Sequence, residues 1–459
     1  MAAHRRQGLT RSDELSNHAP TCPAVRFDDL VPGPAPQAPL EVYLGRRRRL
    51  AEALGPSRAL VVATHPVSTF SNDVEYPFRP HSSFWYLTGF AEPESVLVLR
   101  GGTGESTLFL RERKPEAEIW TGRRLGPERA PGALGVDRAH PVGELGERLA
   151  GLLRGVRHVE AVTAHHPAVH RRVRAAAGRR LASGAERVAE HRVRKDPHEV
   201  RLLRKACDLG VAAHLAAAAT LVPGGHERHP EAAFAHHARH HGSTGVGYGS
   251  ICGCGENAAV LHYVQNRARL REGQLALLDM GCEWGYYTSD ITRTYPVGGR
   301  MSTLQSRLYQ VVLDAHRAGL REVRPGNAFR APHDAAVRVL AEGLVDLGYI
   351  PGDVETAIAE GTYRRFFMHG TSHFLGLDVH DAGWTRDRKG RPRVLEPGMV
   401  LTVEPGLYFN PEFTKCPPGT RGIGIRIEDD VLVTDDGHQN LTRRLPVVPE
   451  EIAGLAGRR

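Results

Sequence analysis

The sequence predicts an α/β domain followed by a second domain of two similar halves, each built from two helices and then several strands. Three observations support this prediction. The chain has 459 residues, which is enough for two or three domains. From Glu41 onward, helical and strand runs alternate over roughly 150 residues, which is typical of an α/β domain. After Asp196 the order of helix, helix and strands occurs twice, which favours two related halves around one sheet, with any shared site between them.

A tail precedes the first domain. Residues 1–38 are polar, rich in proline and without periodicity, so they are expected to be disordered or draped over the surface. A helix is predicted over 40–54, and its arginine cluster at 46–49 is interpreted as a solvated face. The α/β domain is predicted to extend over 39–195, with buried strands and a further helix at 58–63, 95–99, 106–110 and 143–153.

A strong helix start marks the second domain, which is predicted to extend over 196–459. Asp196 is a favoured N-cap residue, Pro197 suits the first helical position, and Glu199 completes a capping box. The pattern then predicts two helices and a set of strands, which are expected over 197–221, 230–242, 248–252, 262–264 and 274–295.

The second half of this domain begins in the same way. Ser302 and Gln305 form another capping box, and the helix that they open should end before Pro325. A further helix and three strand-like segments follow, at 331–347, 368–373, 400–404 and 424–429.

Two aspartates in the first half are the first chemical signal. Asp279 and Asp290 lie in two strand-like runs, and Trp284–Gly285 between them is predicted to be a tight turn. A turn centred there would place Asp279 directly opposite Asp290, with Cβ atoms roughly 5 Å apart. Two carboxylates at this distance repel each other unless a cation lies between them, which indicates a divalent metal.

The second half contains residues that could complete such a site. Three histidines, His369, His373 and His380, cluster among glycines, whose flexible backbone lets side chains converge. Glu404 ends an apolar strand, where a carboxylate is costly to bury unless it is paired or metal-bound.

The segment 422–430 alternates with period two. Its three isoleucines should face a helix-packed core, whereas Arg426 and Glu428 should face the site. Arg426 is then placed to hold a carboxylate in position. Asp279 or Glu404 taken singly would more often be a helix cap or an ion-pair partner, so the metal prediction depends on the combination.

Four carboxylates and one neutral imidazole would balance two divalent cations. Oxygen ligands with one imidazole suit Mn²⁺, Co²⁺ or Zn²⁺. Two metal ions roughly 3.5 Å apart can share a hydroxide and clamp a carbonyl oxygen, which is an arrangement for hydrolysis.

The order Asp279, Asp290, His373, Glu404, Glu428 resembles the five-ligand signature of the pita-bread metallopeptidases, which include methionine aminopeptidase, prolidase and aminopeptidase P. Within this group the chain is most similar to bacterial aminopeptidase P, since methionine aminopeptidases usually lack so large an N-terminal domain. The similarity covers roughly residues 38–452 and is carried by the stretches 82–90, 255–257, 261–263, 366–370 and 422–430. It implies an α/β N-terminal domain and an α+β pita-bread catalytic domain, with its two halves around one curved, mostly antiparallel sheet.

The resemblance also implies a role for each ligand. Asp279 would chelate one metal, Asp290 and Glu428 would bridge both, and His373 and Glu404 would complete the other metal's sphere. Two divalent ions are expected, with Mn²⁺ favoured and Co²⁺ or Zn²⁺ as alternatives. A metal-bridging hydroxide is the implied nucleophile, and Glu404 would carry a proton to the leaving nitrogen.

Further residues match positions around the family's metal site. His262, His369 and His380 would bind substrate and steady the charge that develops on the scissile carbonyl. Arg426 matches an arginine that supports the ligands, and Tyr408 a tyrosine near the substrate. Ordinary loop hydrogen bonding is the alternative interpretation of the three histidines.

The implied function is release of the N-terminal residue from peptides whose second residue is proline. Proline has no amide hydrogen and a fixed φ, so ordinary peptidase clefts bind it poorly. One alternative is a prolidase, which cleaves only Xaa-Pro dipeptides. Another is a non-catalytic peptide-binding module, although all five ligands are present. The resemblance also implies a homo-oligomer, either a dimer or a tetramer.

Composition and charge exclude several other classes. Charged residues make up 24% and hydrophobic residues 41% of the sequence, as in soluble globular proteins. The net charge of +8 rests on scattered arginines without interleaved aromatics, so no nucleic-acid partner is expected. There is no apolar run long enough for a transmembrane helix and no apolar core of a signal peptide, so no membrane partner is expected.

Cysteine and histidine usage adds little further chemistry. The six cysteines are dispersed without metal or disulfide spacing, so free thiols in a cytoplasmic protein are expected. Six more histidines lie close together in one helical stretch and are interpreted as a solvated helix face, namely those at 226, 229, 236, 237, 240 and 241.

Overall fold

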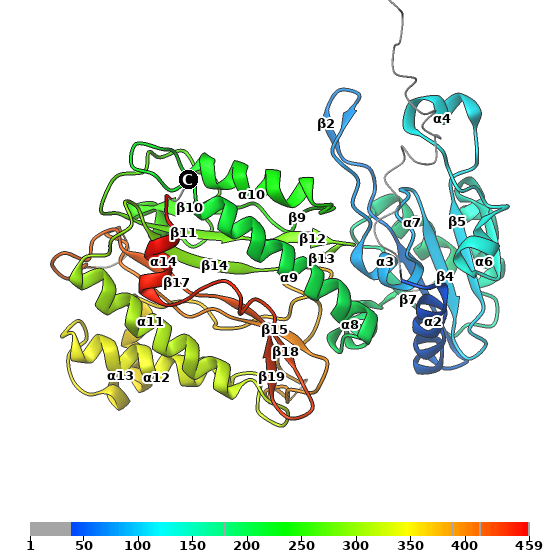
Figure 1. Ribbon diagram of the computed structural model, residues 1–459. Coiled ribbons are helices and arrows are strands. Elements are labelled where there is room, and N and C mark those ends of the chain that lie inside the picture. Colours follow the sequence, from blue (N-terminus) through cyan, green and yellow to red (C-terminus); the bar gives the residue numbers. More distant parts are fainter. Residues whose placement is uncertain (1–37, 179, 388, 413–414, 458–459) are drawn as a thin grey trace, which may run out of the picture.

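The computed structural model describes residues 38–178, 180–387, 389–412 and 415–457. The predicted tail at 1–38 lies outside the described residues except for Ala38. Two domains lie side by side, with the N-terminal domain in blue and cyan and the C-terminal domain in green to red (Figure 1).

The N-terminal domain is built on a mixed six-stranded sheet in the order β6-β5-β4-β1-β7-β8. Its central strand β1 is antiparallel to β4 and parallel to β7. The predicted strands and helices are present within a residue or two. The strands are β1 Arg58–Ala63, β4 Val96–Arg100, β5 Ser106–Leu110, β6 Arg138–Pro141, β7 His158–Val162 and β8 Ala182–Ser183.

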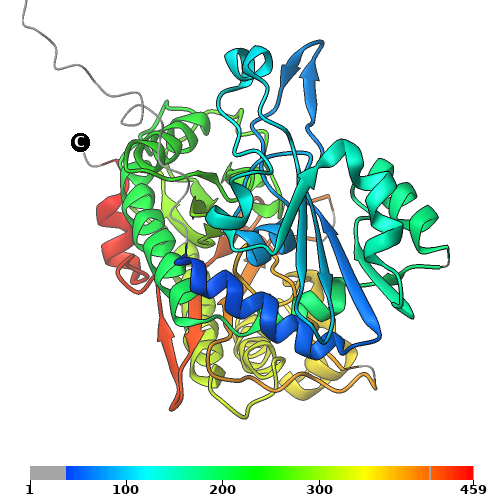
Figure 2. The same ribbon diagram turned by 90° about the vertical axis from the view of Figure 1, so that its right-hand side faces the viewer.

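Helices cover both faces of this sheet because its buried strands alternate their side chains between two cores. On one face, Leu60 packs with Leu50 of α2 and with α3, and on the other face Val61 packs with α6 and α7. Figure 2 shows α2, in dark blue, on the opposite side of the sheet from α6 and α7. The helices are α2 Leu40–Leu54, α3 Ser82–Thr88, α4 Pro115–Thr121, α5 Ala130–Leu134, α6 Leu145–Leu152, α7 Pro167–Ala177 and α8 Ala185–Val193. A short hairpin, β2 Thr69–Ser71 and β3 Val74–Glu75, projects from the domain.

The interpretation of the arginine cluster as a solvated face was wrong for two of its four members. Arg48 and Arg49 are exposed, but Arg46 and Arg47 are only 2% and 3% exposed. Arg47 donates hydrogen bonds to the carbonyls of Leu87, Leu134 and Gly135. These carbonyls belong to the C-terminal ends of α3 and α5, where backbone acceptors have no helical partner and attract a cation.

The C-terminal domain repeats one order of elements, as predicted. The first half contains α9 Pro197–Ala218, α10 Arg228–His240, β9 Gly245–Val246, β10 Ile251–Cys254, β11 Leu275–Met280, β12 Cys282–Trp284, β13 Tyr287–Thr288 and β14 Ile291–Pro296. The second contains α11 Thr303–Glu322, α12 Ala331–Asp346, α13 Val354–Glu360, β15 Val400–Val403, β16 Gly406–Tyr408, β17 Gly424–Arg426, β18 Asp429–Val433 and β19 His438–Asn440, and α14 Pro449–Leu455 follows. Both predicted capping boxes are present, at Asp196 and Ser302. In the His-rich stretch, His236 and His240 are exposed on α10, as expected.

In Figure 1 the strands of this domain lie between α10 above and α11 to α13 below, and α9 runs obliquely across them. Among the described residues of this domain, all strand pairings are antiparallel, and they form four short sheets. A backbone bridge between Thr292 and Glu428 connects β14 to the second half. The two halves therefore meet at the strand that follows Asp290.

Three strand predictions need correction. Residues 262–264 and 368–373 are irregular rather than extended strands. The aspartate hairpin has a different register, because Gly285 and Tyr286, with φ of 60° and 68°, form its two-residue turn. Asp279 consequently faces Thr292 and not Asp290, which is a diagonal neighbour on the opposing strand.

The two domains share a buried junction. Arg46 donates to Asp196, the N-cap of α9, and lies 3.4 Å from Glu199. Glu199 in turn accepts from the Tyr287 hydroxyl, just before Asp290. One hydrophobic cluster contains Leu60 and Phe84 of the first domain together with Leu203 of the second. Among the described helices, none is both long and apolar enough to cross a membrane.

Candidate active site

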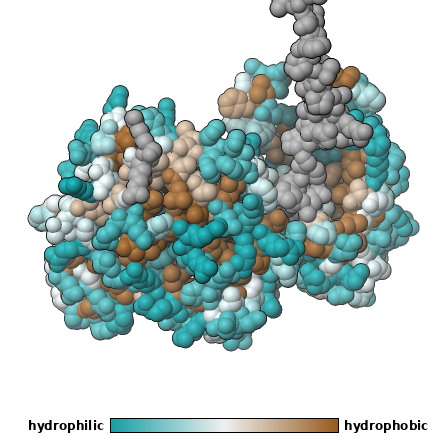
Figure 3. Space-filling view, in the orientation of Figure 1, coloured by the Kyte–Doolittle hydropathy of each residue, from teal (hydrophilic) through white to brown (hydrophobic). Residues whose placement is uncertain are grey.

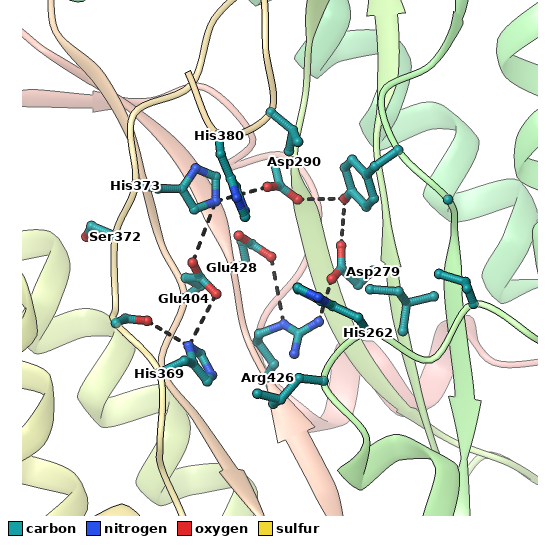
Figure 4. Close-up of a pocket in the computed structure, with 17 residues that line it drawn as sticks. His262, Asp279, Asp290, His369, Ser372, His373, His380, Glu404, Arg426 and Glu428 are labelled. Carbon is teal, nitrogen blue, oxygen red and sulfur yellow. Dashed lines mark hydrogen bonds and ion pairs between the residues drawn. The ribbon is translucent and has the colours of Figure 1, made fainter. Parts of the chain in front are cut away.

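A cavity of ≈ 570 Å³ lies where the two halves of the C-terminal domain meet (Figure 4). It is lined by nine of the ten residues that the sequence singled out: His262, Asp279, Asp290, His369, His373, His380, Glu404, Arg426 and Glu428. The tenth, Tyr408, is fully buried and contacts both His369 and Arg426.

The two aspartates meet at a tyrosine. The Tyr248 hydroxyl lies 2.6 Å from Oδ1 of Asp279 and 2.6 Å from Oδ1 of Asp290. A hydroxyl has one proton, so it can donate to only one of the two carboxylates at a time. The diagonal register therefore still brings the aspartates together, through a third side chain.

Arg426 joins the two halves of the site. Its Nη2 donates to Asp279 Oδ2 at 2.5 Å, its Nη1 donates to the Tyr408 hydroxyl at 3.0 Å, and its Nε lies 3.9 Å from Glu428. The expected support of a carboxylate by Arg426 is thus directed mainly to Asp279, across the site.

Glu428 is held in place by Thr292, which belongs to the first half of the domain. The Thr292 hydroxyl donates to Glu428 Oε2 at 2.5 Å, and the Glu428 amide donates to the Thr292 carbonyl at 3.1 Å. On the other side of this strand, Ile423, Ile425 and Ile427 join the helix-packed core, as the period-two pattern predicts.

His373 lies between two acidic side chains. Its Nδ1 is 3.0 Å from the Phe374 carbonyl, and its Nε2 is 3.3 Å from Asp290 and 3.6 Å from Glu404. Burial lowers the pKa of His373, but the hydrogen bond with Asp290 and the charge of Glu404 outweigh burial and raise this pKa to about 9. Without a cation, a proton on His373 takes the place of one.

His369 is fixed by two hydrogen bonds of its own. Its Nδ1 lies 2.7 Å from the Gly370 carbonyl, which can only accept, so Nδ1 carries the proton. Its Nε2 then accepts from the Tyr408 hydroxyl at 2.8 Å. Burial, reinforced by the charge of Arg426, lowers the pKa of His369 to about 3, so the ring is neutral.

His262 and His380 have free rings. In the described part of the chain, neither imidazole makes a hydrogen bond, and the ring of His380 packs against that of His373 with centroids 4.3 Å apart. Both side chains line the cavity, so their ring nitrogens can donate to a ligand.

The donor set fits a divalent cation. Ligand atoms of Asp290, His373 and Glu428 all lie within 4.8 Å of one another, with two oxygens and one imidazole nitrogen. Burial raises the pKa of Asp279, Glu404 and Glu428, in the case of Glu404 to about 7, and the neighbouring carboxylates raise all three further. The carboxylates are therefore short of positive charge, which a bound metal would supply.

Two functional side chains were missed in the sequence. Tyr248 lies between two glycines just before β10, and only that setting hinted at a special position. In the sequence, Thr292 has the features of an ordinary strand residue. Both act on carboxylates from distant parts of the chain, which a local pattern does not reveal.

Two family models match the chain. The model of metallopeptidase family M24 matches residues 201–435, and that of the aminopeptidase P N-terminal domain matches residues 43–160.

Individual relatives agree with these matches. The Xaa-Pro aminopeptidase of Escherichia coli strain K12 is 43% identical over 427 residues, which cover 89% of this chain and 96% of the relative. The structure of proline aminopeptidase P II from Yersinia pestis is 41% identical and covers 91% of this chain and 99% of its own, with a TM-score of 0.87. Zinc-substituted E. coli aminopeptidase P in complex with product is also 41% identical and covers 92% and 98%, with a TM-score of 0.88.

Proposed function

The chain belongs to metallopeptidase family M24, and from this premise we propose that it releases the N-terminal residue from peptides whose second residue is proline. The family and architecture predicted from the motifs are confirmed, since an aminopeptidase P N-terminal domain precedes the pita-bread domain. It is a metal-dependent aminopeptidase, and the relatives favour this activity over that of a prolidase.

One observation carries the assignment to this site. Five side chains with metal-ligand chemistry, contributed by both halves of the domain, line one cavity: Asp279, Asp290, His373, Glu404 and Glu428. We propose Asp279 as a ligand of one metal, Asp290 and Glu428 as bridges, and His373 and Glu404 as ligands of the other. Mn²⁺ is the proposed metal, with Co²⁺ and Zn²⁺ as alternatives.

Bound divalent cations would polarise the carbonyl group of the substrate and lower the pKa of a bound water molecule. The chain supplies positioning and proton transfer. Glu404 is the proposed proton carrier, because its carboxylate lies in the cavity beside His373 and His369. His262 and His380, with free ring nitrogens, are the proposed donors to the carbonyl oxygen of the substrate.

His369 is assigned a supporting role. Its Nδ1 proton is engaged by the Gly370 carbonyl, and its Nε2 accepts from Tyr408. Through Tyr408 it is linked to Arg426, and its ring lies 3.6 Å from Glu404. We therefore propose that His369, Tyr408 and Arg426 together orient Glu404 and Asp279 around the substrate.

The test offers Xaa-Pro dipeptides and Xaa-Pro-Pro tripeptides to the Mn²⁺-loaded enzyme and then adds a chelator. We expect cleavage of the tripeptides after the first residue, loss of activity with chelator, and recovery when Mn²⁺ is restored. Cleavage of dipeptides alone would favour the prolidase alternative. Activity that survives both chelation and Asp290→Asn would overturn the metal assignment. Metal analysis of the purified protein, with reloading by Mn²⁺, Co²⁺ and Zn²⁺ in turn, tests the identity of the metal.

Assembly and location are further parts of the proposal. We propose a homo-oligomer, a dimer or a tetramer, because large apolar side chains of the N-terminal domain are exposed on its two projections. Figure 3 shows these hydrophobic patches over the β2–β3 hairpin and α4, where Phe70 is 64% and Ile119 82% exposed. Light scattering of Phe70→Ser and Ile119→Ser variants tests this proposal, and an unchanged mass would argue against these patches as the interface.

A cytoplasmic location is supported by the thiols. The thiols of Cys207, Cys252, Cys254 and Cys282 are buried and form no disulfide, which suits a reducing compartment. The proposed domain limits remain 39–195 and 196–459, with residues 1–38 as a tail. Limited proteolysis, with cleavage expected before residue 39, tests the tail.

A further inference from the structure

The segment that carries His380 is held by residues from outside the cavity. Asp378 precedes His380 by two residues and accepts hydrogen bonds from the Ser82 hydroxyl at 2.6 Å and from Arg192 Nη2 at 2.7 Å. Ser82 lies on α3 of the N-terminal domain, and Arg192 lies near the end of α8. Arg79, just before α3, donates to the Leu377 carbonyl at 2.5 Å.

Asp381, directly after His380, is held from the same side. Its Oδ1 accepts from Arg192 Nη2 at 2.5 Å, and its Oδ2 accepts from Lys195 Nζ at 3.0 Å. The side chains of Arg192 and Asp381 are 4% and 1% exposed, so solvent hardly screens this ion pair. The guanidinium of Arg192 therefore binds the chain on both sides of His380.

His380 depends on these anchors more than His369 does. Its ring forms no hydrogen bond within the described residues, whereas His369 is held by Tyr408 and by the Gly370 carbonyl. The residues around His380 form neither a helix nor a strand, so no regular ladder fixes their backbone. Beside the packing of its ring on His373 and the hydrogen bond from the Asp381 amide to the Phe374 carbonyl, the side-chain anchors of Asp378 and Asp381 fix the position of His380.

We propose that Arg192 is a positioning residue, which places His380 against the substrate by clamping Asp378 and Asp381. This inference rests on the proposed function, in which His380 donates to the substrate carbonyl. It assigns Ser82 of the N-terminal domain, together with Arg192 and Lys195, a part in the reaction geometry. The physical reason is that without the guanidinium Asp378 and Asp381 lose their common counter-charge, and the loop between them can move by the fraction of an ångström that matters for transition-state contacts.

The test compares Arg192→Met with Arg194→Met. Arg194 lies two residues further on, and its side chain is 60% exposed in an ion pair with Glu396, so it is a matched surface control. We expect Arg192→Met to lower kcat on an Xaa-Pro-Pro tripeptide by roughly 10–100-fold, with Mn²⁺ content unchanged. Arg194→Met should leave kcat unchanged. Arg192→Lys, which keeps the charge but not the fork, should recover part of the loss.

A double variant separates positioning from general damage. If Arg192 acts through His380, then Arg192→Met combined with His380→Ala should be no slower than His380→Ala alone. Two losses that multiply would overturn the proposal, and so would a loss of bound Mn²⁺ in Arg192→Met. Should Arg192→Met fail to fold, Ser82→Ala removes one hydrogen bond from the same clamp and should show a smaller loss with the same non-additivity.

Hydrogen exchange provides a measurement that does not depend on activity. Arg192→Met should speed amide exchange in the segment 374–384 and leave the segment 275–284 unchanged, whatever substrate the enzyme prefers. Unchanged exchange in 374–384 would refute the clamp. If exchange changes but the wild-type enzyme does not cleave the tripeptide, the proposed function fails and the clamp stands.

Discussion

The two sides of the active site are built differently. One side is a carboxylate wall, formed by Asp279, Asp290 and Glu428, whose backbones lie in or beside β11, β14, β17 and β18. The other side is a histidine segment, residues 369–380, which contains neither a helix nor a strand. The wall is held by strand pairing, including the bridge from Thr292 to Glu428. The segment pairs with β15 around Phe374, and its histidines are held in addition by individual side-chain bonds, such as that between His369 and Tyr408.

The difference indicates a division of work. A sheet holds its residues at constant spacing without help from outside, which suits ligands whose oxygens must keep a fixed distance. An irregular segment can bring several imidazoles toward one substrate atom, but each ring then needs its own support. We therefore expect damage to the wall, or to the proposed ligand His373, to remove metal, and damage to the other histidines of the segment to slow the reaction with metal in place.

The largest expected effect is that of Asp290→Asn in the wall. Asp290 lies beside both His373 and Tyr248, and the neutral amide cannot supply the charge that a shared cation requires. We expect kcat/KM to fall by roughly 1,000-fold or more, together with loss of bound metal. Steady-state kinetics and metal analysis on the same sample check this. Full metal content with little loss of rate would break the comparison.

His369→Ala in the histidine segment should have the next largest effect. The change removes the acceptor of the Tyr408 hydroxyl and a neighbour of Glu404. We expect kcat to fall by about 100-fold with Mn²⁺ content unchanged. Loss of metal comparable to that in Asp290→Asn would show that wall and segment are not separate in function. His236→Ala, at an exposed ring on α10, is a control.

Tyr248→Phe tests whether the Tyr248 hydroxyl supports metal binding by the carboxylate wall. The variant leaves both aspartates in place and removes only the hydroxyl between them. We expect the affinity for Mn²⁺, measured by calorimetry, to fall by about 10–100-fold. Tyr263→Phe removes a hydroxyl that binds Glu227 instead and should leave the affinity unchanged. Equal affinities in wild type and Tyr248→Phe would remove Tyr248 from the site.

The smallest expected effect concerns the metal-free enzyme at different pH. The pKa of His373 is raised from 6.5 to about 9, so its contribution to stability is present below pH 6.5 and is lost as the pH rises to 9. The pKa of Glu404 is raised from 4.5 to about 7, so its contribution is lost as the pH rises through 7. Both groups therefore lower the stability as the pH rises. We expect Tm in the presence of chelator to fall by ~2–4 °C from pH 6.5 to 9.

Two comparisons check that assignment. His373→Gln should flatten the decline in Tm, and Mn²⁺ should abolish it because the cation replaces the protons. A Tm that rises with pH in the presence of chelator, or a decline of equal size in His373→Gln, would contradict the role given to this pair.

The parts of the fold that were predictable depend on local chemistry. The capping boxes at Asp196 and Ser302 were recognisable because a cap and its partner lie three residues apart. The buried face of the strand before Glu428, which carries the isoleucines, was recognisable because side chains alternate between the two faces within a single strand. The hairpin register was not, because Gly285–Tyr286 and Trp284–Gly285 are adjacent candidates, and Tyr286 adopts a positive φ that is uncommon for tyrosine.

Long-range partners explain the remaining misses. Arg47 resembles Arg48 in sequence, and only the carbonyls at the ends of α3 and α5 distinguish them. Tyr248 contacts two aspartates more than thirty residues away in the chain. The ligand types in the site could be proposed from the motifs, whereas the side chains that hold them became visible only in three dimensions.

The junction between the domains has a consequence for protein engineering. A fragment beginning at Asp196 would lack Arg46, leaving the buried Glu199, which accepts from Tyr287, without its cation. It would also expose the part of the shared hydrophobic cluster that Leu203 contributes. The N-terminal domain is consequently not a detachable module that could be trimmed or exchanged between enzymes, and the two domains should melt as one cooperative unit.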